Sequence, residues 1–247
     1  MAFEIISNLT NSVALSSFAF LILVLIMVYR TVRVMKIPKN KGMRFFIIMS
    51  FLLLLWFGAV FLLGNIGFFA KNPLFAPNII FGFLVLFHFL RMAYHSKTVQ
   101  TVAEAIPTTW IVAIQTYRIV GVGFLILYAQ KQLPAAFALP SGIGDILVGV
   151  SAPFVAILYY LKKPYSKKLA IVWNIIGIAD LVIAVSVGIL GFPRPVQFLP
   201  LAPSTEPLSL FPLVIIPLFA VPLATLLHFL SLRVLQNQKG LKITSSY

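Results

Sequence analysis

The sequence predicts an all-α membrane protein with seven transmembrane helices. Of its 247 residues, 61% are hydrophobic and only 10% are charged, whereas a soluble domain carries about 25% charged residues. The apolar residues also gather in seven runs, each close to the roughly 20 residues that a helix needs to cross a bilayer. Outer-membrane strands would instead show alternating segments of about ten residues. We therefore expect a single helical bundle over residues 1–247, with helices at about 13–29, 45–63, 77–94, 109–129, 141–161, 169–190 and 208–232.

The first three runs have clear limits. Residues 1–12 contain no basic residue, so the first run is expected to be a retained helix rather than a secretory signal. The second run ends at Gly64-Asn65, a turn signal. The third opens at Pro77, in the first turn of a helix, where the missing N–H costs nothing.

Prolines, glycines and charges separate the remaining runs. Glu104 and Pro107 mark a linker before the fourth run, and the segment QKQLPAAFALP (130–140) is expected to be a loop before the fifth. Four lysines follow the fifth run, and a Pro-rich loop (191–207) precedes the seventh.

The basic residues predict the orientation in the membrane. Lys and Arg number 15 on one side of the runs and 3 on the other, and Arg118 is the remaining one of 19. Because Lys and Arg are concentrated in cytoplasmic loops, the N-terminus is expected outside and the C-terminus in the cytoplasm. The predicted location is the bacterial cytoplasmic (inner) membrane, with multiple passes. The net charge of +14 lies in short loops beside apolar runs, so we expect contact with membrane lipids and no nucleic-acid binding.

Two internal similarities compete. Residues 83–92 (FLVLFHFLRM) resemble residues 223–232 (LATLLHFLSL), which hints at a weak 3+1+3 parallel repeat of the kind found in small transporters. Chance is the alternative, since Leu and Phe dominate both segments. Residues 142–150 and 177–185 also resemble each other, but they would pair helices that run in opposite directions.

Three charged residues lie inside apolar sequence: Arg118, Asp145 and Asp180. At about 1.5 Å of rise per residue, Arg118 and Asp180 should lie near the middle of the bilayer, with Asp145 closer to its outer surface. A charged side chain at that depth costs about 2.5–3.5 kcal/mol, so we predict that the three pair with one another. One guanidinium between two carboxylates leaves a formal charge of −1, so either one carboxylate is protonated or the cluster binds a proton or cation.

Two amides extend this set. Gln115 lies one turn before Arg118, and Asn174 lies deeper than Asp180, toward the cytoplasm. We predict a polar site of Gln115, Arg118, Asp145, Asn174 and Asp180 between the fourth, fifth and sixth helices. Intramembrane ionisable groups mark binding pockets or pathways; the alternative is a structural network that only fixes the helix register.

His88 and His228 form a second candidate site. Both lie near the cytoplasmic ends of helices that run in parallel, and two facing imidazoles can hold a haem or a metal ion. The alternative is that each imidazole bonds to a neighbouring helix. The chain has no cysteine, which excludes thiolate metal sites and disulfides. Apart from the haem alternative, we predict no metal site and no cofactor.

Four motifs appear between Trp110 and Leu232: QxYRxxG, GxGDxLVG, WNxxGxxDL and IPxFxVPLxxLLHxLSL. In these motifs the chain resembles a group of bacterial polytopic membrane proteins to which no activity is assigned. The resemblance implies that six residues hold motif positions, and it implies no substrate or reaction. These residues are Gln115, Arg118, Asp145, Asn174, Asp180 and His228.

The sequence favours a small-solute carrier or permease that binds a small molecule or ion at the buried polar site. Two alternatives stay open: a lipid-modifying enzyme embedded in the membrane, and a sensor or scaffold with a structural Arg–Asp network. The soluble-enzyme motifs of phosphate and nucleotide binding are missing from the sequence, so whether the chain is an enzyme is left undecided, as is its oligomeric state.

Overall fold

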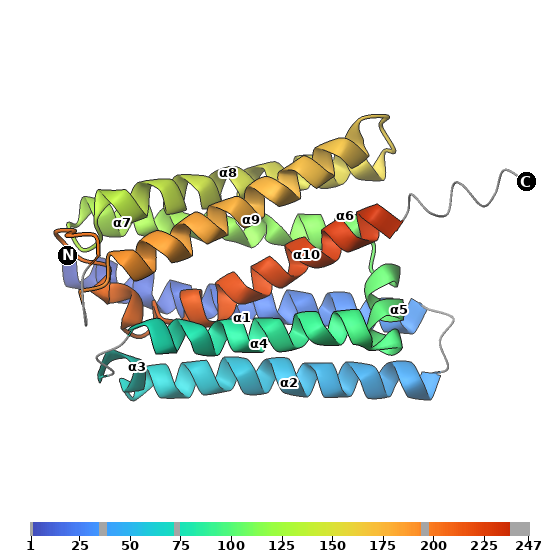
Figure 1. The fold of residues 1–247 in the computed structure, drawn as a ribbon, viewed down its shortest axis with the longest axis horizontal. Coiled ribbons are helices and arrows are strands. Elements are labelled where there is room, and N and C mark those ends of the chain that lie inside the picture. Colours follow the sequence, from blue (N-terminus) through green and yellow to red (C-terminus); the bar gives the residue numbers. More distant parts are fainter. Residues whose placement is uncertain (1, 35–38, 72–74, 194–197, 238–247) are drawn as a thin grey trace, which may run out of the picture.

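The computed structural model describes residues 2–34, 39–71, 75–193 and 198–237, and this part of the chain is helical and contains no strand. The long helices run roughly lengthwise through one bundle, with α9 and α10 inclined to α1, α2 and α4 (Figure 1). They are α1 (Ala2–Val34), α2 (Lys39–Asn65), α4 (Phe75–His95), α8 (Ala135–Tyr160), α9 (Ser166–Leu190) and α10 (Val221–Asn237). A further span joins α6 (Thr108–Ala113), the 3₁₀ helix η1 (Ile114–Gly121) and α7 (Val122–Ala129). The short elements are α3 (Phe68–Lys71), α5 (Lys97–Ala105), η2 (Glu206–Ser209) and the π-helical turn η3 (Ile216–Ala220).

Among the described residues, six helices are long and apolar enough to cross a membrane, which confirms the all-α class and the membrane-like character of the chain. The other predicted span, α4, is a helix of 21 residues. Among the α4 residues whose side chains are described, the apolar stretch is Gly82–Met92. This stretch is shorter than each of the six membrane-length helices. Seven crossings therefore remain a prediction. The spans are residues 12–34, 40–65, 108–129, 135–160, 166–190 and 216–237.

Four predicted helix starts were wrong. Helix α1 begins at Ala2 rather than at residue 13 and α2 at Lys39 rather than at residue 45, because both helices extend beyond their apolar runs into polar residues. Helix α8 begins at Ala135 rather than at residue 141, because Pro134 precedes a run of good helix formers and Pro140 is accommodated inside the helix. The last helix begins at Ile216 rather than at residue 208. Several prolines interrupt the preceding segment, where each removes a backbone donor.

The predicted linker before the fourth span contains the helix α5. Ser96 caps it, since its hydroxyl accepts a hydrogen bond from the Val99 N–H at 3.4 Å. Val99, Val102 and Ala103 are buried, and α5 lies across the end of the bundle rather than along it (Figure 1).

Helix α10 lies at the centre of the bundle. In Figure 1 it crosses obliquely between α1, α2 and α4 on one side and α7, α8 and α9 on the other. Its span is 78% buried, against 17% for α2. One core cluster joins its Leu223 and Leu227 to Phe20 of α1 and Trp56 of α2. Most side chains of α10 are therefore shielded inside the bundle, and buried polar groups on it need partners inside the protein.

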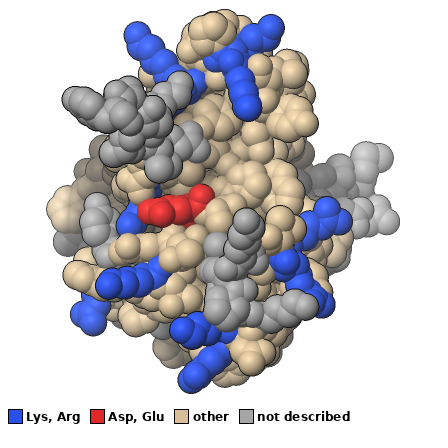
Figure 2. Space-filling view, turned by 90° about the vertical axis from the view of Figure 1, so that its right-hand side faces the viewer, with Lys and Arg blue, Asp and Glu red and all other residues tan. Residues whose placement is uncertain are grey.

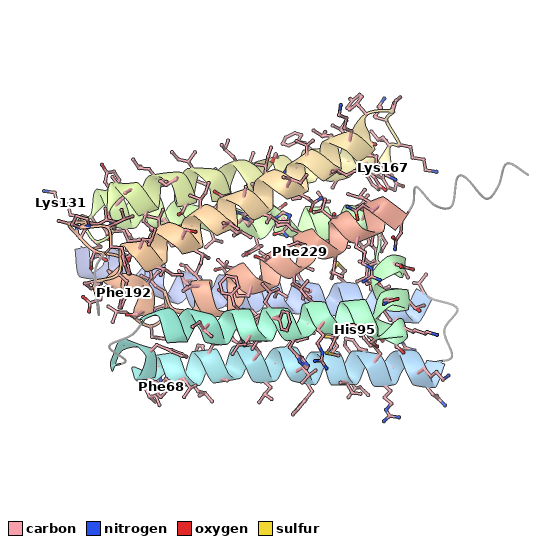
Figure 3. All side chains as sticks on the ribbon, in the orientation of Figure 1. Phe68, His95, Lys131, Lys167, Phe192 and Phe229 are labelled. Atoms are coloured by element: carbon pink, nitrogen blue, oxygen red, sulfur yellow. The ribbon has the colours of Figure 1, made fainter. Side chains whose placement is uncertain are left out.

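The two ends of the bundle differ in charge. Figure 2 shows many Lys and Arg side chains around the end of the bundle where α1 ends and α2 begins and where α5 and the α8–α9 turn lie. Lys131 lies at the opposite end (Figure 3). The sequence also assigns Lys71 and Arg194 to this less basic side, but their side chains lie outside the described part of the structure.

Candidate functional site

Arg118 lies on the 3₁₀ helix η1, in the middle of the fourth span. A 3₁₀ helix has three residues per turn, so positions three apart share a face. The buried residues of η1 follow this spacing: Gln115, Arg118 and Gly121. The irregular turn therefore directs the Arg118 side chain into the bundle, where Arg118 is only 2% exposed.

The Arg118 guanidinium donates to groups on three other helices. Its Nε donates to Asp145 Oδ1 of α8 at 2.7 Å, and its Nη2 donates to Asp180 Oδ2 of α9. Its Nη1 donates to the Gly177 carbonyl oxygen and to His228 Nε2, each at 3.2 Å. Arginine is the residue that can serve so many acceptors at once, because its five N–H groups form a rigid planar fork.

The arginine also determines the state of His228. Because a guanidinium only donates, His228 Nε2 must accept, and the proton of the neutral imidazole is then on Nδ1. That N–H donates to Asn174 Oδ1 at 2.9 Å. Asn174 Nδ2 in turn donates to Ser231 Oγ at 3.0 Å and to the Ala170 carbonyl at 2.7 Å. The result is a continuous hydrogen-bonded chain from Asp145 to Ser231, in which His228 and Asn174 are completely buried.

Glycines make room for these side chains. A Cβ on Gly144 would overlap the Asp180 carboxylate, and a Cβ on Gly177 would overlap the His228 ring. On Gly121 it would overlap the Asp145 side chain. Small residues let membrane helices approach closely, and here they do so at the positions where the polar side chains cross between helices.

The span with η1 is also tied to the start of the last helix. Gln115 Nε2 donates to the Ala224 carbonyl at 3.1 Å, and the Tyr117 hydroxyl donates to the Ala220 carbonyl at 3.2 Å. Ala220 ends the π-helical turn η3. Two irregular helix segments thus face each other beside Arg118, Asp145 and Asp180, which together form the Arg118 cluster.

The cluster is charge-unbalanced and partly open on its acidic side. The side chains of Asp145 and Asp180 are 17% and 13% exposed, against 1% for Arg118. A cavity of about 40 Å³ reaches Asp145 and Arg118 beside Ser16 and Ser17 of α1. A second cavity of about 30 Å³ also reaches Asp145. Since a water molecule needs about 10–15 Å³ of such space, these cavities suit waters or a small cation but not a larger solute.

The structure joins Arg118, Asp145 and Asp180 directly and links Asn174 to them through His228. The fifth predicted residue, Gln115, lies one turn from Arg118 on η1, but its amide donates to the Ala224 carbonyl rather than to any of these side chains. It does not pair His88 with His228. His88 is exposed on α4, and both ring nitrogens of His228 are already hydrogen bonded. The described residues contain no group of three or more His, Asp or Glu side chains suited to a metal ion.

The sequence analysis missed several members of the network. For His228 it left open a haem or metal site or a bond to a neighbouring helix, and the bonds to Arg118 and Asn174 correspond to the second. It did not consider Ser231, although the i, i+3 spacing of His228 and Ser231 is a signal for a polar face on the last helix. It also overlooked Tyr117, whose ring stacks on Phe20 of α1 at 3.7 Å between centroids. The three-residue spacing of Gln115, Arg118 and Gly121 was the available signal for the 3₁₀ turn.

Replacing Asn174 with leucine is expected to lower the free energy of unfolding by about 1–3 kcal/mol, because the His228 Nδ1–H would be buried without an acceptor. Unfolding in SDS and detergent mixtures measures this. Ser186→Ala is the control on the same helix, since Ser186 is exposed and bonds only within its helix; its effect should stay within about 0.5 kcal/mol. Equal stability of Asn174→Leu and the parent would show that the Asn174–His228 bond contributes nothing.

Comparison with protein families matches the part of the chain that contains the Arg118 network. The family described as domain of unknown function (DUF8737) matches residues 74–236, about two thirds of the chain. The match includes every residue of the Arg118 network and leaves α1 and α2 outside. A comparison with curated proteins and with solved structures gives no match. On this family match, the chain belongs to the DUF8737 family.

Proposed function

We propose that this protein is a multi-pass carrier or permease for a small solute in the bacterial inner membrane, with its binding site at the Arg118 cluster. The observation that carries the proposal is the enclosed charge imbalance. One guanidinium faces two carboxylates deep among apolar helices, and small cavities reach Asp145. A buried formal charge of −1 favours the uptake of a proton or a cation.

The proposed roles follow from the contacts. Arg118 holds the anionic group of a solute or serves as the counter-ion of the aspartates. Asp145 is the group beside both cavities, so it carries the exchangeable proton or cation. Asp180 holds the guanidinium in place.

The interrupted helices support a carrier. Irregular backbone at membrane depth is tolerated where it is buried in protein or lines a cavity, and transporters bind substrates at such breaks. Here η1 and η3 contribute to one small cavity, through Arg118 and Ile216. A solute larger than a few waters requires these segments to move apart.

The proposed topology has seven crossings, with the N-terminus outside. α1 begins at one end of the bundle and α10 ends at the other (Figure 1), as an odd number of crossings requires. The end rich in Lys and Arg (Figure 2) would face the cytoplasm.

A structural latch is the second candidate. The observation that favours it is the completeness of the hydrogen bonding around Arg118, whose Nε, Nη1 and Nη2 all have acceptors. In this alternative the cluster fixes helix register in a sensor or scaffold and moves nothing.

Uptake into proteoliposomes tests the carrier. The purified protein, supplied with a panel of small anionic and zwitterionic solutes, should accumulate at least one of them faster under an imposed pH gradient. Asp145→Asn keeps an acceptor for Arg118 Nε but no exchangeable proton, so it should abolish the acceleration by the gradient, a loss of tenfold or more. Glu206→Gln also replaces a carboxylate by an amide, at a residue of the short helix η2 that lines neither cavity, and should leave uptake unchanged. Absence of uptake across the panel would count against a carrier.

A further inference from the structure

A broad groove lies at the basic end of the bundle, between the α5–α6 junction and the turn that joins α8 to α9. Its volume is about 1000 Å³, more than twenty times that of either cavity at Asp145. It is separate from the Arg118 cluster, because none of the cluster residues lines it.

The groove is positively charged. Lys162, Lys163 and Lys167 line it, and Glu104 is the acidic residue in its lining. The Glu104 carboxylate accepts a hydrogen bond from Asn237 Nδ2 at 2.8 Å. The formal charge of the lining is therefore +2, and it suits an anion.

A buried hydroxyl in the groove is without a partner. Thr108 lines the groove and is only 4% exposed, yet its Oγ1 has no hydrogen-bond partner among the described residues. Buried hydroxyls are almost always hydrogen bonded. An oxygen-rich anion in the groove would supply the missing acceptor beside the lysines.

Lys162 occupies a backbone position that favours glycine. Helix α8 ends with Lys163 N–H bonded to the Leu158 carbonyl and Lys162 N–H bonded to the Tyr159 carbonyl, which is a Schellman motif. The residue after its C-cap adopts the left-handed conformation and is usually glycine; here it is Lys162, with φ of 51°. A glycine would fit this backbone position, so the Lys162 side chain can be removed without backbone strain.

Helix α7 ends in the same way at the opposite end of the bundle. Lys131 N–H bonds to the Tyr128 carbonyl, Gln132 N–H bonds to the Leu127 carbonyl, and Lys131 has φ of 58°. Figure 3 places Lys131 far from Lys167, which lines the groove. The chain thus contains a matched pair of left-handed lysines, of which only Lys162 lines the groove.

We propose that this groove binds the phosphate-bearing headgroup of an anionic phospholipid. The lysines and the Thr108 hydroxyl would contact the phosphate. A lipid is favoured over a free anion because the groove lies where membrane-crossing helices end. Tyr159 and Tyr160 line it, and tyrosine is enriched at the membrane interface. Ile106 and Val234 add an apolar lining for the glycerol and acyl region.

Titration of the purified full-length protein with phosphatidylglycerol in mixed micelles tests the proposal, with the thermal unfolding midpoint as readout. Phosphatidylglycerol should raise the midpoint and phosphatidylcholine should not. Lys162→Gly removes one cation and suits the left-handed backbone, so the variant should fold at least as well as the parent but bind phosphatidylglycerol about fivefold more weakly. Lys131→Gly makes the same backbone change at the other end and should bind like the parent.

Two further variants distinguish binding in the groove from a general electrostatic attraction between the basic end of the protein and the lipid. Lys168→Gln removes a cation from the same turn, outside the groove lining, and should leave the affinity unchanged; Thr108→Val should weaken it. Equal weakening by Lys162→Gly, Lys168→Gln and Lys131→Gly would overturn the site in favour of diffuse electrostatics. An equal rise of the midpoint with inorganic phosphate at the same concentration would overturn the lipid as the ligand.

Discussion

Arg118→Met is expected to lower the free energy of unfolding by about 3–5 kcal/mol, because it leaves two carboxylates among apolar helices without their cation. Arg118 is the common partner of Asp145, Asp180 and His228. Methionine fills part of the same volume and supplies no donor. SDS-induced unfolding of the purified protein measures the loss.

Arg91→Met is the matched control for this change. Arg91 is exposed on α4, so its replacement should alter stability by no more than about 0.5 kcal/mol. The combined variant Arg118→Met/Asp145→Asn/Asp180→Asn removes all three charges and should recover most of the stability, since a fully neutral centre has no buried charge to compensate. If Arg118→Met alone is as stable as the parent, the three charges do not depend on one another.

Gly177→Ala should destabilise the protein by about 3 kcal/mol, at the upper end of the effect of overpacking. The added methyl carbon would lie 2.6 Å from His228 Nε2 and 3.2 Å from Nδ1. The ring cannot withdraw easily, because Arg118 and Asn174 hold its two nitrogens. A shift of the ring would also break the bond from Arg118. Thermal unfolding in detergent detects the change.

Gly188→Ala provides the control on the same helix, and its expected change in stability has the opposite sign. There the methyl carbon would make ordinary contacts at 3.6 Å with Leu208 and Phe137. Alanine favours a helix over glycine by about 0.5–1 kcal/mol, so this variant should be slightly more stable than the parent. A Gly177→Ala protein as stable as Gly188→Ala would contradict the close packing of α9 on His228.

The all-α class and the six long membrane-like helices follow from hydrophobicity alone, because lipid leaves few options to an apolar chain. Local boundaries were harder to predict. Pro140 and the prolines between residues 203 and 212 give the same sequence signal, yet Pro140 lies inside α8 and the others precede the start of the last span. Tertiary packing decides which prolines a helix accommodates, and that packing cannot be read from one segment.

The three charges of the site were predictable because isolation in lipid is unfavourable for each. His228 was not, since its role depends on a 3₁₀ turn in another span. An ordinary α-helix through residues 114–121 would place Gln115, Arg118 and Gly121 on a wider arc than the single row they form. The role of Gly121, Gly144 and Gly177 could not be predicted either, because it depends on which side chains of neighbouring helices pack against them.

The central claim is that the Arg118 cluster moves a solute rather than merely joining helices. It is tested most directly by solute flux in proteoliposomes through the charge-free variant Arg118→Met/Asp145→Asn/Asp180→Asn, compared with the parent at matched stability. We predict a folded variant whose pH-driven flux is at least tenfold lower. Flux equal to that of the parent would show that the three charges only hold the helices together and would contradict the proposed function.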